Sequence, residues 1–166
     1  MAWGFIALAE GREPFDLSAP ERSRLRHRLR HHAELGPLVQ LTRKRAETHR
    51  LHVHRGALVR ARDWPGAVPT GTSAPGHDLV KTDSVEIYVP AMALSKLMNA
   101  VRAKDASGSE VNLIVRVPTV DRWPFLADAG PVTVAFDLWE AGDDRSRRSA
   151  QKLFTQAMSA HEGFER

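Results

Sequence analysis

Alternating and helical hydrophobic patterns follow one another in the middle of the chain. The segment "SVEIYVP" alternates Glu86 and Tyr88 with apolar residues, which predicts a half-buried strand ended by Pro90. In "AMALSKLMNAV" the apolar residues recur at i, i+3, i+4 and i+7, so we expect a helix with one core face. After the loop "DASGS", the segment "EVNLIVRVP" predicts a second strand.

The C-terminal pattern predicts a helical hairpin. Residues 130–141 are apolar nearly all round, which is typical of a buried helix. Gly142 is the expected C-terminal stop, and Asp143 is the expected cap of the next helix. That helix places Ala150, Leu153, Phe154 and Ala157 on one face. The two helices should therefore fold back on each other.

The N-terminal part has thinner apolar patterns. Residues 1–19 read as a leader of uncertain structure with apolar side chains available for docking. A helix is expected from Ser18 or Ala19, with Pro20 in its first turn and a narrow stripe of Leu25, Leu29 and Ala33 surrounded by arginines. Gly36 and Pro37 should break it, and "PLVQLTRKRAETHR" should form a second helix. A strand over 49–54 and a short helix over 55–64 follow.

These elements indicate an α+β fold. We expect a small mixed β-sheet packed with helices and a C-terminal helical hairpin, preceded by a basic helical N-terminal arm. With 166 residues the chain can bury one good core. The division expected is a basic helical region over 1–65 and an α+β core domain over 66–166.

The positive charge belongs to the N-terminal region. Residues 1–65 carry 13 Lys or Arg against 7 Asp or Glu, whereas residues 66–166 carry 11 against 13. The forked guanidinium group of arginine suits phosphate. The residues nominated for nucleic-acid contact are Arg26, Arg30, Arg43, Lys44, Arg45 and Arg50. The alternatives are a solvated basic surface, a homodimer interface, or a protein-interaction module that engages an acidic partner.

Composition and the remaining motifs argue against membrane proteins, P-loop proteins and hydrolases with a nucleophilic serine. The chain has no cysteine, no basic region ahead of its first apolar run, and no apolar run that approaches a membrane span, which predicts a cytoplasmic protein with no membrane contact. "GTSAPGHD" lacks the lysine and spacing of a P-loop, and no Gly-x-Ser-x-Gly motif occurs. No cofactor is expected.

Two places in the sequence could carry chemistry: the carboxylate of Asp137 and a group of histidines in the expected strand. Asp137 is a carboxylate inside an apolar helix, so we expect a structural ion pair with an arginine past the turn, with Arg145 as the nominated partner rather than a catalytic role. His52 and His54 would share one face of a strand, where His77 or Asp78 could complete a metal site. Exposed strand histidines are the commoner outcome, so we nominate no metal site, and a histidine-based metal enzyme is the remaining alternative.

A family resemblance covers roughly residues 66–157. The run "SVEIYVP … EVNLIVRVP … WPF … GPVTVAFDLWEAGDDRSRRSAQKLF" resembles the C-terminal domain of AbiEi-like antitoxins and related transcriptional regulators of type IV toxin-antitoxin systems. Members of that family carry an N-terminal winged helix that binds their own promoter, and they accompany a nucleotidyltransferase-like toxin. The resemblance implies a non-enzymatic regulator that binds a toxin partner, with double-stranded DNA as a further partner.

Overall fold

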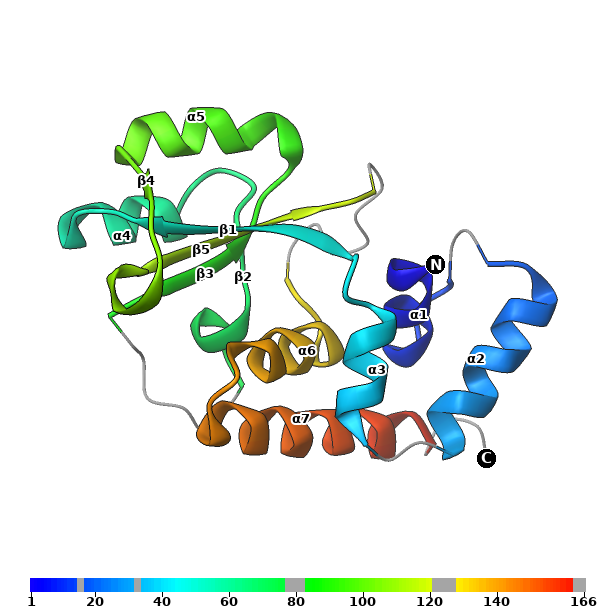
Figure 1. The fold of residues 1–166 in the computed structure, drawn as a ribbon. Helices are drawn as coiled ribbons and strands as arrows, with labels where there is room; N and C mark the ends of the chain where they lie inside the picture. Colours follow the sequence, from blue (N-terminus) through cyan, green and yellow to red (C-terminus); the bar gives the residue numbers. More distant parts are fainter. Residues whose placement is uncertain (15–16, 32–33, 77–82, 121–127, 163–166) are drawn as a thin grey trace. The chain divides into compact units, whose positions relative to one another are not determined.

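A computed structural model describes residues 1–166 except 15–16, 32–33, 77–82, 121–127 and 163–166 (Figure 1). The side chains of Arg30, His31, His161 and Glu162 are also outside the description. The helices are α1 (Ala2–Ala9), α2 (Ala19–His31), α3 (Leu35–Leu41), α4 (Arg55–Arg62), α5 (Ala91–Val101), α6 (Pro131–Ala141) and α7 (Asp144–Glu162). The strands are β1 (Ala46–His52), β2 (Val68–Pro69), β3 (Val85–Tyr88), β4 (Lys104–Asp105) and β5 (Leu113–Pro118), with short 3-10 turns η1 (Gly71–Ser73) and η2 (Gly108–Glu110).

The chain forms two compact units. Met1–Arg45 and Gly130–Arg166 together make the first, which we call the helical unit, and Ala46–Ala129 make the second, the sheet unit. The helical unit is therefore built from both ends of the chain. This grouping differs from the division expected at residues 65 and 66.

The sheet unit contains a mixed sheet with strand order β2-β3-β5-β1-β4 in the described part of the chain. β3 and β5 run parallel, with α5 in the connection between them, and the other neighbours are antiparallel. Helices α4 and α5 pack against one face, where a continuous apolar core includes Leu51, Ile87, Leu97 and Val115. The mixed sheet with packed helices and the C-terminal helical pair confirm the predicted α+β class.

Strand β3 is buried on both faces rather than on one. All four of its residues are buried, including Glu86 and Tyr88, which the alternating pattern had assigned to solvent. The prediction of a half-buried strand was wrong because Glu86 takes part in a polar network described below, so its charge does not require water.

The helical unit is organised around α6. Seven consecutive residues of α6, Val132–Leu138, are buried, and α7 lies along it as the second half of a hairpin (Figure 1). The Phe136 ring has the Phe5 ring of α1 at 6.4 Å and the Phe154 ring of α7 at 6.1 Å between centroids. Gly142 ends α6 with φ of 88°, and Asp143 accepts a hydrogen bond from Ser146 N–H at 2.9 Å. The predicted stop and cap are thus confirmed.

The N-terminal segment confirms the expected docking of its apolar side chains, but helix α1 and the start of α3 were not expected. The expected leader contains α1, whose Trp3, Phe5 and Ile6 are almost completely buried. Helix α3 starts at Leu35 and keeps Gly36 and Pro37 in its first turn, where proline's missing N–H needs no partner. A Cβ on Gly36 would lie 3.1 Å from the Trp139 ring of α6, so glycine lets the two helices approach closely.

The first strand was also misplaced. β1 begins at Ala46, three residues before the expected start, and it takes residues assigned to the second helix. It ends at His52, and His54 instead caps α4 by accepting a hydrogen bond from Gly56 N–H at 3.2 Å. None of the described helices has the length and apolar character needed to cross a membrane.

Candidate functional site

Helix α2 starts with a cap formed between Ser18 and Glu21. The backbone N–H and the hydroxyl of Ser18 both donate to the Glu21 carboxylate, at 2.8 and 2.6 Å. These bonds lower the pKa of the Glu21 carboxyl, with the Ser18 hydroxyl as the largest cause. A serine three positions before a glutamate is a common helix-start signature, so the beginning of α2 is set locally.

The anchor of α2 is narrow. Leu25 is buried and Leu29 is half-buried, and the helix packs on α1. Arg22 is held against the preceding segment, because its Nη1 donates to Glu13 at 2.8 Å and its Nε donates to the Leu17 carbonyl at 3.1 Å. The predicted thin apolar stripe is confirmed at Leu25 and Leu29, while Ala33 lies outside the described residues.

The remaining surface of α2 is basic and exposed. Its sequence contains five arginines against one glutamate, and the side chains of Arg24, Arg26 and Arg28 are exposed. They occupy alternate positions, which spreads the guanidinium groups around the helix and makes the charged surface broad. This arrangement suits an extended polyanion better than a small anion held in a pocket.

The nominated nucleic-acid residues fall in both units. Arg26 is exposed on α2, and Arg43 and Lys44 are exposed in the turn after α3, all in the helical unit. Arg50 is exposed on β1 of the sheet unit. The side chain of Arg30 lies outside the described residues.

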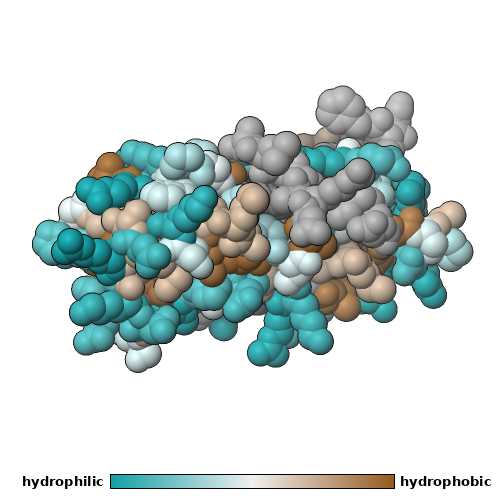
Figure 2. All heavy atoms as spheres, turned by 90° about the horizontal axis from the view of Figure 1, so that it is seen from above, coloured by the Kyte–Doolittle hydropathy of each residue, from teal (hydrophilic) through white to brown (hydrophobic). Residues whose placement is uncertain are grey.

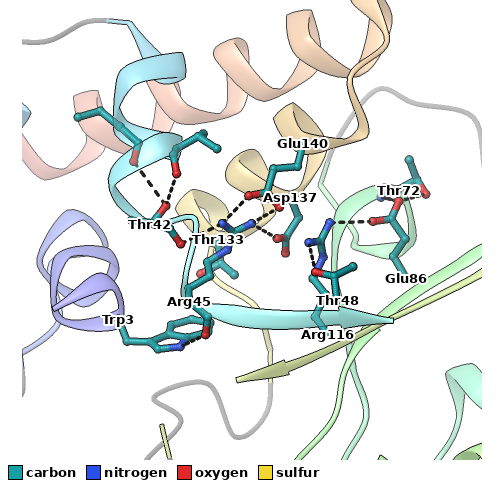
Figure 3. A network of polar contacts seen from close by, with 12 residues as sticks. Trp3, Thr42, Arg45, Thr48, Thr72, Glu86, Arg116, Thr133, Asp137 and Glu140 are labelled. Atoms are coloured by element: carbon teal, nitrogen blue, oxygen red, sulfur yellow. Dashed lines mark hydrogen bonds and ion pairs between the residues drawn. The ribbon is translucent and has the colours of Figure 1, made fainter. Parts of the chain in front are cut away.

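Arg45 was wrongly nominated for nucleic-acid contact. It is 1% exposed, and its guanidinium faces α6 (Figure 3). Nη2 lies 2.5 Å from Oδ1 of Asp137, and the two terminal nitrogens each lie 2.8 Å from an oxygen of Glu140. The Arg45 carbonyl also accepts the Trp3 indole N–H at 2.6 Å. Both the side chain and the backbone of Arg45 are therefore fixed inside the helical unit.

The same network corrects the partner of Asp137. Its carboxylate is completely buried and paired with Arg45, 92 positions earlier in the chain, whereas the predicted partner Arg145 is exposed past the turn. Proximity along the sequence favoured Arg145, but α6 packs against α3, and Arg45 lies shortly after α3 in the chain. No local signal separates Arg45 from its neighbours in "RKR".

A second buried carboxylate, which the sequence did not single out, holds the start of α6. Glu10 accepts hydrogen bonds from the Thr133 backbone N–H at 3.1 Å and from its hydroxyl at 3.0 Å. Gly130 leaves room for this carboxylate, because a Cβ there would overlap it. A negative charge at a helix N-terminus is stabilised by the unpaired N–H groups and the helix dipole. The role of Glu10 is therefore structural.

The sheet unit contains its own buried polar network (Figure 3). Glu86 of β3 accepts from the Thr72 hydroxyl at 3.0 Å, and Arg116 Nη2 of β5 lies 3.6 Å from its other oxygen. Arg116 Nη1 also donates to the Thr48 hydroxyl of β1 at 3.4 Å. Gly71 allows the turn η1 to lie against the carboxylate, since a Cβ there would overlap it. The network joins three strands and one turn.

The histidines of the predicted strand do not converge. His52 Nδ1 lies 2.8 Å from the Glu110 carbonyl, while His54 has left the strand to cap α4. His49 Nε2 lies 3.6 Å from Glu47. The proposed third ligands, at positions 77 and 78, lie outside the described residues. Within the described ranges, no three histidine, aspartate or glutamate side chains are grouped in a way that could hold a metal ion.

Hydrophilic residues dominate the face seen in Figure 2, where the hydrophobic patches are small and separated. Among the described residues, the exposed large apolar side chains are Met1, Leu41, Val59 and Met92. The charged surface of α2 is thus a stronger candidate for recognition than an apolar patch.

Comparisons with family models, with curated proteins and with solved structures find no match to this chain. The candidate site therefore depends on its own geometry and charge.

Proposed function

We propose that this chain is a non-enzymatic regulator of the cytoplasm whose helix α2 binds the phosphate backbone of double-stranded DNA. The observation that carries the proposal is the exposure of Arg24, Arg26 and Arg28 on a helix whose described apolar contacts are made by Leu25 and Leu29. Arg43 and Lys44 add positive charge in the same unit.

The physical basis is counterion release. Each arginine that neutralises a phosphate frees condensed cations from the duplex, so affinity should fall steeply as salt rises. Phosphate contacts position a protein on DNA without reading its sequence. Any preference for one duplex would therefore come from base or shape contacts in addition to those of α2.

The test is fluorescence anisotropy with a duplex from upstream of the protein's own coding sequence and a scrambled duplex, each over a salt series. The variant carries Arg24→Gln, Arg26→Gln and Arg28→Gln together. If the three arginines contact phosphates, the slope of log affinity against log salt should become shallower by about 2.7, at about 0.9 per contact.

A matched control is the double variant Arg55→Gln, Arg62→Gln. Both arginines are exposed but already paired, Arg55 with Asp83 at 2.8 Å and Arg62 with Asp63 at 3.0 Å, so their loss should change binding little. An α2 variant that binds with the wild-type slope would overturn the proposal. Weak, equal binding of both duplexes by the wild type would instead favour a protein-interaction module that uses α2 to engage an acidic partner.

The proposal includes a toxin partner, which the resemblance over residues 66–157 supports. A nucleotidyltransferase-like toxin encoded beside this protein should co-purify with it and lose its growth-arresting effect when both are expressed together. Growth arrest that is unchanged by co-expression would remove this part of the proposal and leave DNA binding to be judged separately.

A further inference from the structure

One residue of the sheet unit has a backbone conformation that its side chain disfavours. Arg102, which follows α5, has φ of 53° and ψ of 46°, in the left-handed region. Every other described residue with positive φ is a glycine. A Cβ crowds the backbone in this conformation, and only a few per cent of non-glycine residues adopt it.

Helix α6 also ends with a residue in the left-handed conformation, and there the residue is a glycine. Gly142 occupies the equivalent position there, with φ of 88°. At the end of α5, Arg102 N–H donates to the Asn99 carbonyl at 3.2 Å and Ala103 N–H donates to the Met98 carbonyl at 2.9 Å. These two bonds define a cap in which glycine is strongly preferred at the position of Arg102.

A basic side chain can stabilise a helix C-terminus, but another arginine already does so here. Arg60 of α4 donates from Nη1 to the Ala100 carbonyl at 3.1 Å. Arg102 itself is exposed, and within the described ranges it has no ion pair or side-chain hydrogen bond. Asp105, the nearest acidic residue in sequence, is exposed and forms no ion pair with it. Among the described residues, no side-chain hydrogen bond or ion pair therefore accounts for an arginine at this position.

We propose that Arg102 and Arg60 form a phosphate-binding site for nucleic acid on the sheet unit, separate from α2. Arg102 brings an exposed guanidinium to the end of α5, and Arg60 keeps further N–H donors beyond the one used by Ala100. Two forked donors at one helix end fit the oxygens of a phosphodiester. The inference rests on the proposed DNA binding and adds a contact from the second unit.

The decisive variant is Arg102→Gly, because thermal stability and DNA affinity should change in opposite directions. Removing the Cβ relieves the left-handed position, so the melting temperature without DNA should rise by about 2–4 °C. In the anisotropy assay, affinity for the same duplex should fall about tenfold at low salt, which is the loss of one charge-assisted hydrogen bond. The salt slope should become shallower by about 0.9.

Two further variants separate the effect of the lost charge from the effect of the relieved backbone strain. Arg102→Gln keeps the strained residue but removes the charge, so it should lose affinity without gaining thermal stability. Arg62→Gln removes a charge of the same unit that is already paired with Asp63, and it should leave binding unchanged.

Higher stability of Arg102→Gly with unchanged affinity would overturn the site, and so would a fall in its melting temperature. The α2 variant tests the other surface independently. Loss of binding in the α2 variant alone would keep the proposed function and reject this site, whereas loss in Arg102→Gly alone would keep this site and reject α2 as the contact. A wild-type protein that binds no duplex would reject both.

Discussion

Arg45 has a structural role that its position in the basic run "RKR" does not indicate. It stands between an exposed lysine and a strand, yet its guanidinium is buried with Asp137 and Glu140. Burying a charge is costly unless it is paired and hydrogen-bonded, and Arg45 meets both conditions. Removing Arg45 would take its cationic partner from the completely buried carboxylate of Asp137.

Replacement of Arg45 by methionine should therefore lower the free energy of unfolding by about 3–5 kcal/mol. Methionine keeps much of the side-chain volume, so the loss would come mainly from the unpaired carboxylate of Asp137. The measurement is urea unfolding followed by circular dichroism. The matched control is Arg43→Met, two residues away and exposed, which should change stability by less than about 0.5 kcal/mol.

A double variant with Arg45→Met and Asp137→Leu should recover much of the loss, because both charges are then absent. If Arg45→Met were as stable as the wild type, the buried pair would contribute nothing and its structural interpretation would fail. Loss of an activity in Asp137→Asn at unchanged thermal stability would likewise contradict a structural role for that acid.

At the scale of elements, local signals located the helices of the C-terminal half correctly. The start of α6 at Pro131, its end at Gly142 and the cap at Asp143 are all encoded within a few residues. The failures lie where a contact from elsewhere decides the outcome. Residues 46–48 continue a helical pattern in sequence, but β5 pairs with them and makes them strand.

The cap of α7 gives a pH-dependent prediction. Hydrogen bonds from the hydroxyl and backbone N–H of Ser146 lower the pKa of the Asp143 carboxyl from its ordinary value of 3.8. A lowered folded-state pKa stabilises the fold above the unfolded value, and this contribution is lost as pH falls through the folded value. Asp143→Asn keeps an acceptor but cannot ionise.

Wild type should therefore melt above Asp143→Asn at about pH 6, and the difference should shrink as pH falls below the ordinary carboxyl value of 3.8. Thermal melts over this range measure it. Asp144→Asn, which removes the same charge one residue inside the helix, is the control for the change in net charge. A difference between wild type and Asp143→Asn that stays constant down to the lowest pH would show that the carboxylate charge does not matter to the cap.

At the scale of the whole molecule, the N-terminal segment contacts both residues of the helical unit that border the sheet unit in sequence. Trp3 donates to the carbonyl of Arg45, the last residue before the sheet unit. The Glu10 carboxylate lies against Gly130, the first residue after it. Helix α1 is therefore a core element of the helical unit.

Deletion of residues 1–11 should consequently destabilise the helical unit by at least about 5 kcal/mol, since burying a large apolar side chain contributes about 1.5–3 kcal/mol and α1 buries Trp3, Phe5 and Ile6. Circular dichroism should show lost helicity and a lower melting temperature. Leu41→Ala, at a half-exposed site of α3, is the comparison and should have a small effect. A truncated chain that melts like the wild type would contradict this role of α1.

Local patterns were sufficient to predict the α+β class, helices α5, α6 and α7, strands β3 and β5, and the basic character of α2, because periodicity, caps and charge are properties of neighbouring residues. Four features follow from packing between distant segments: both chain ends form one unit, Arg45 rather than Arg145 pairs with Asp137, Glu10 caps α6, and Arg116 is buried with Glu86. Each of these depends on residues far apart in the chain, and the partner of a buried charge is set by which surfaces pack together rather than by distance along the sequence.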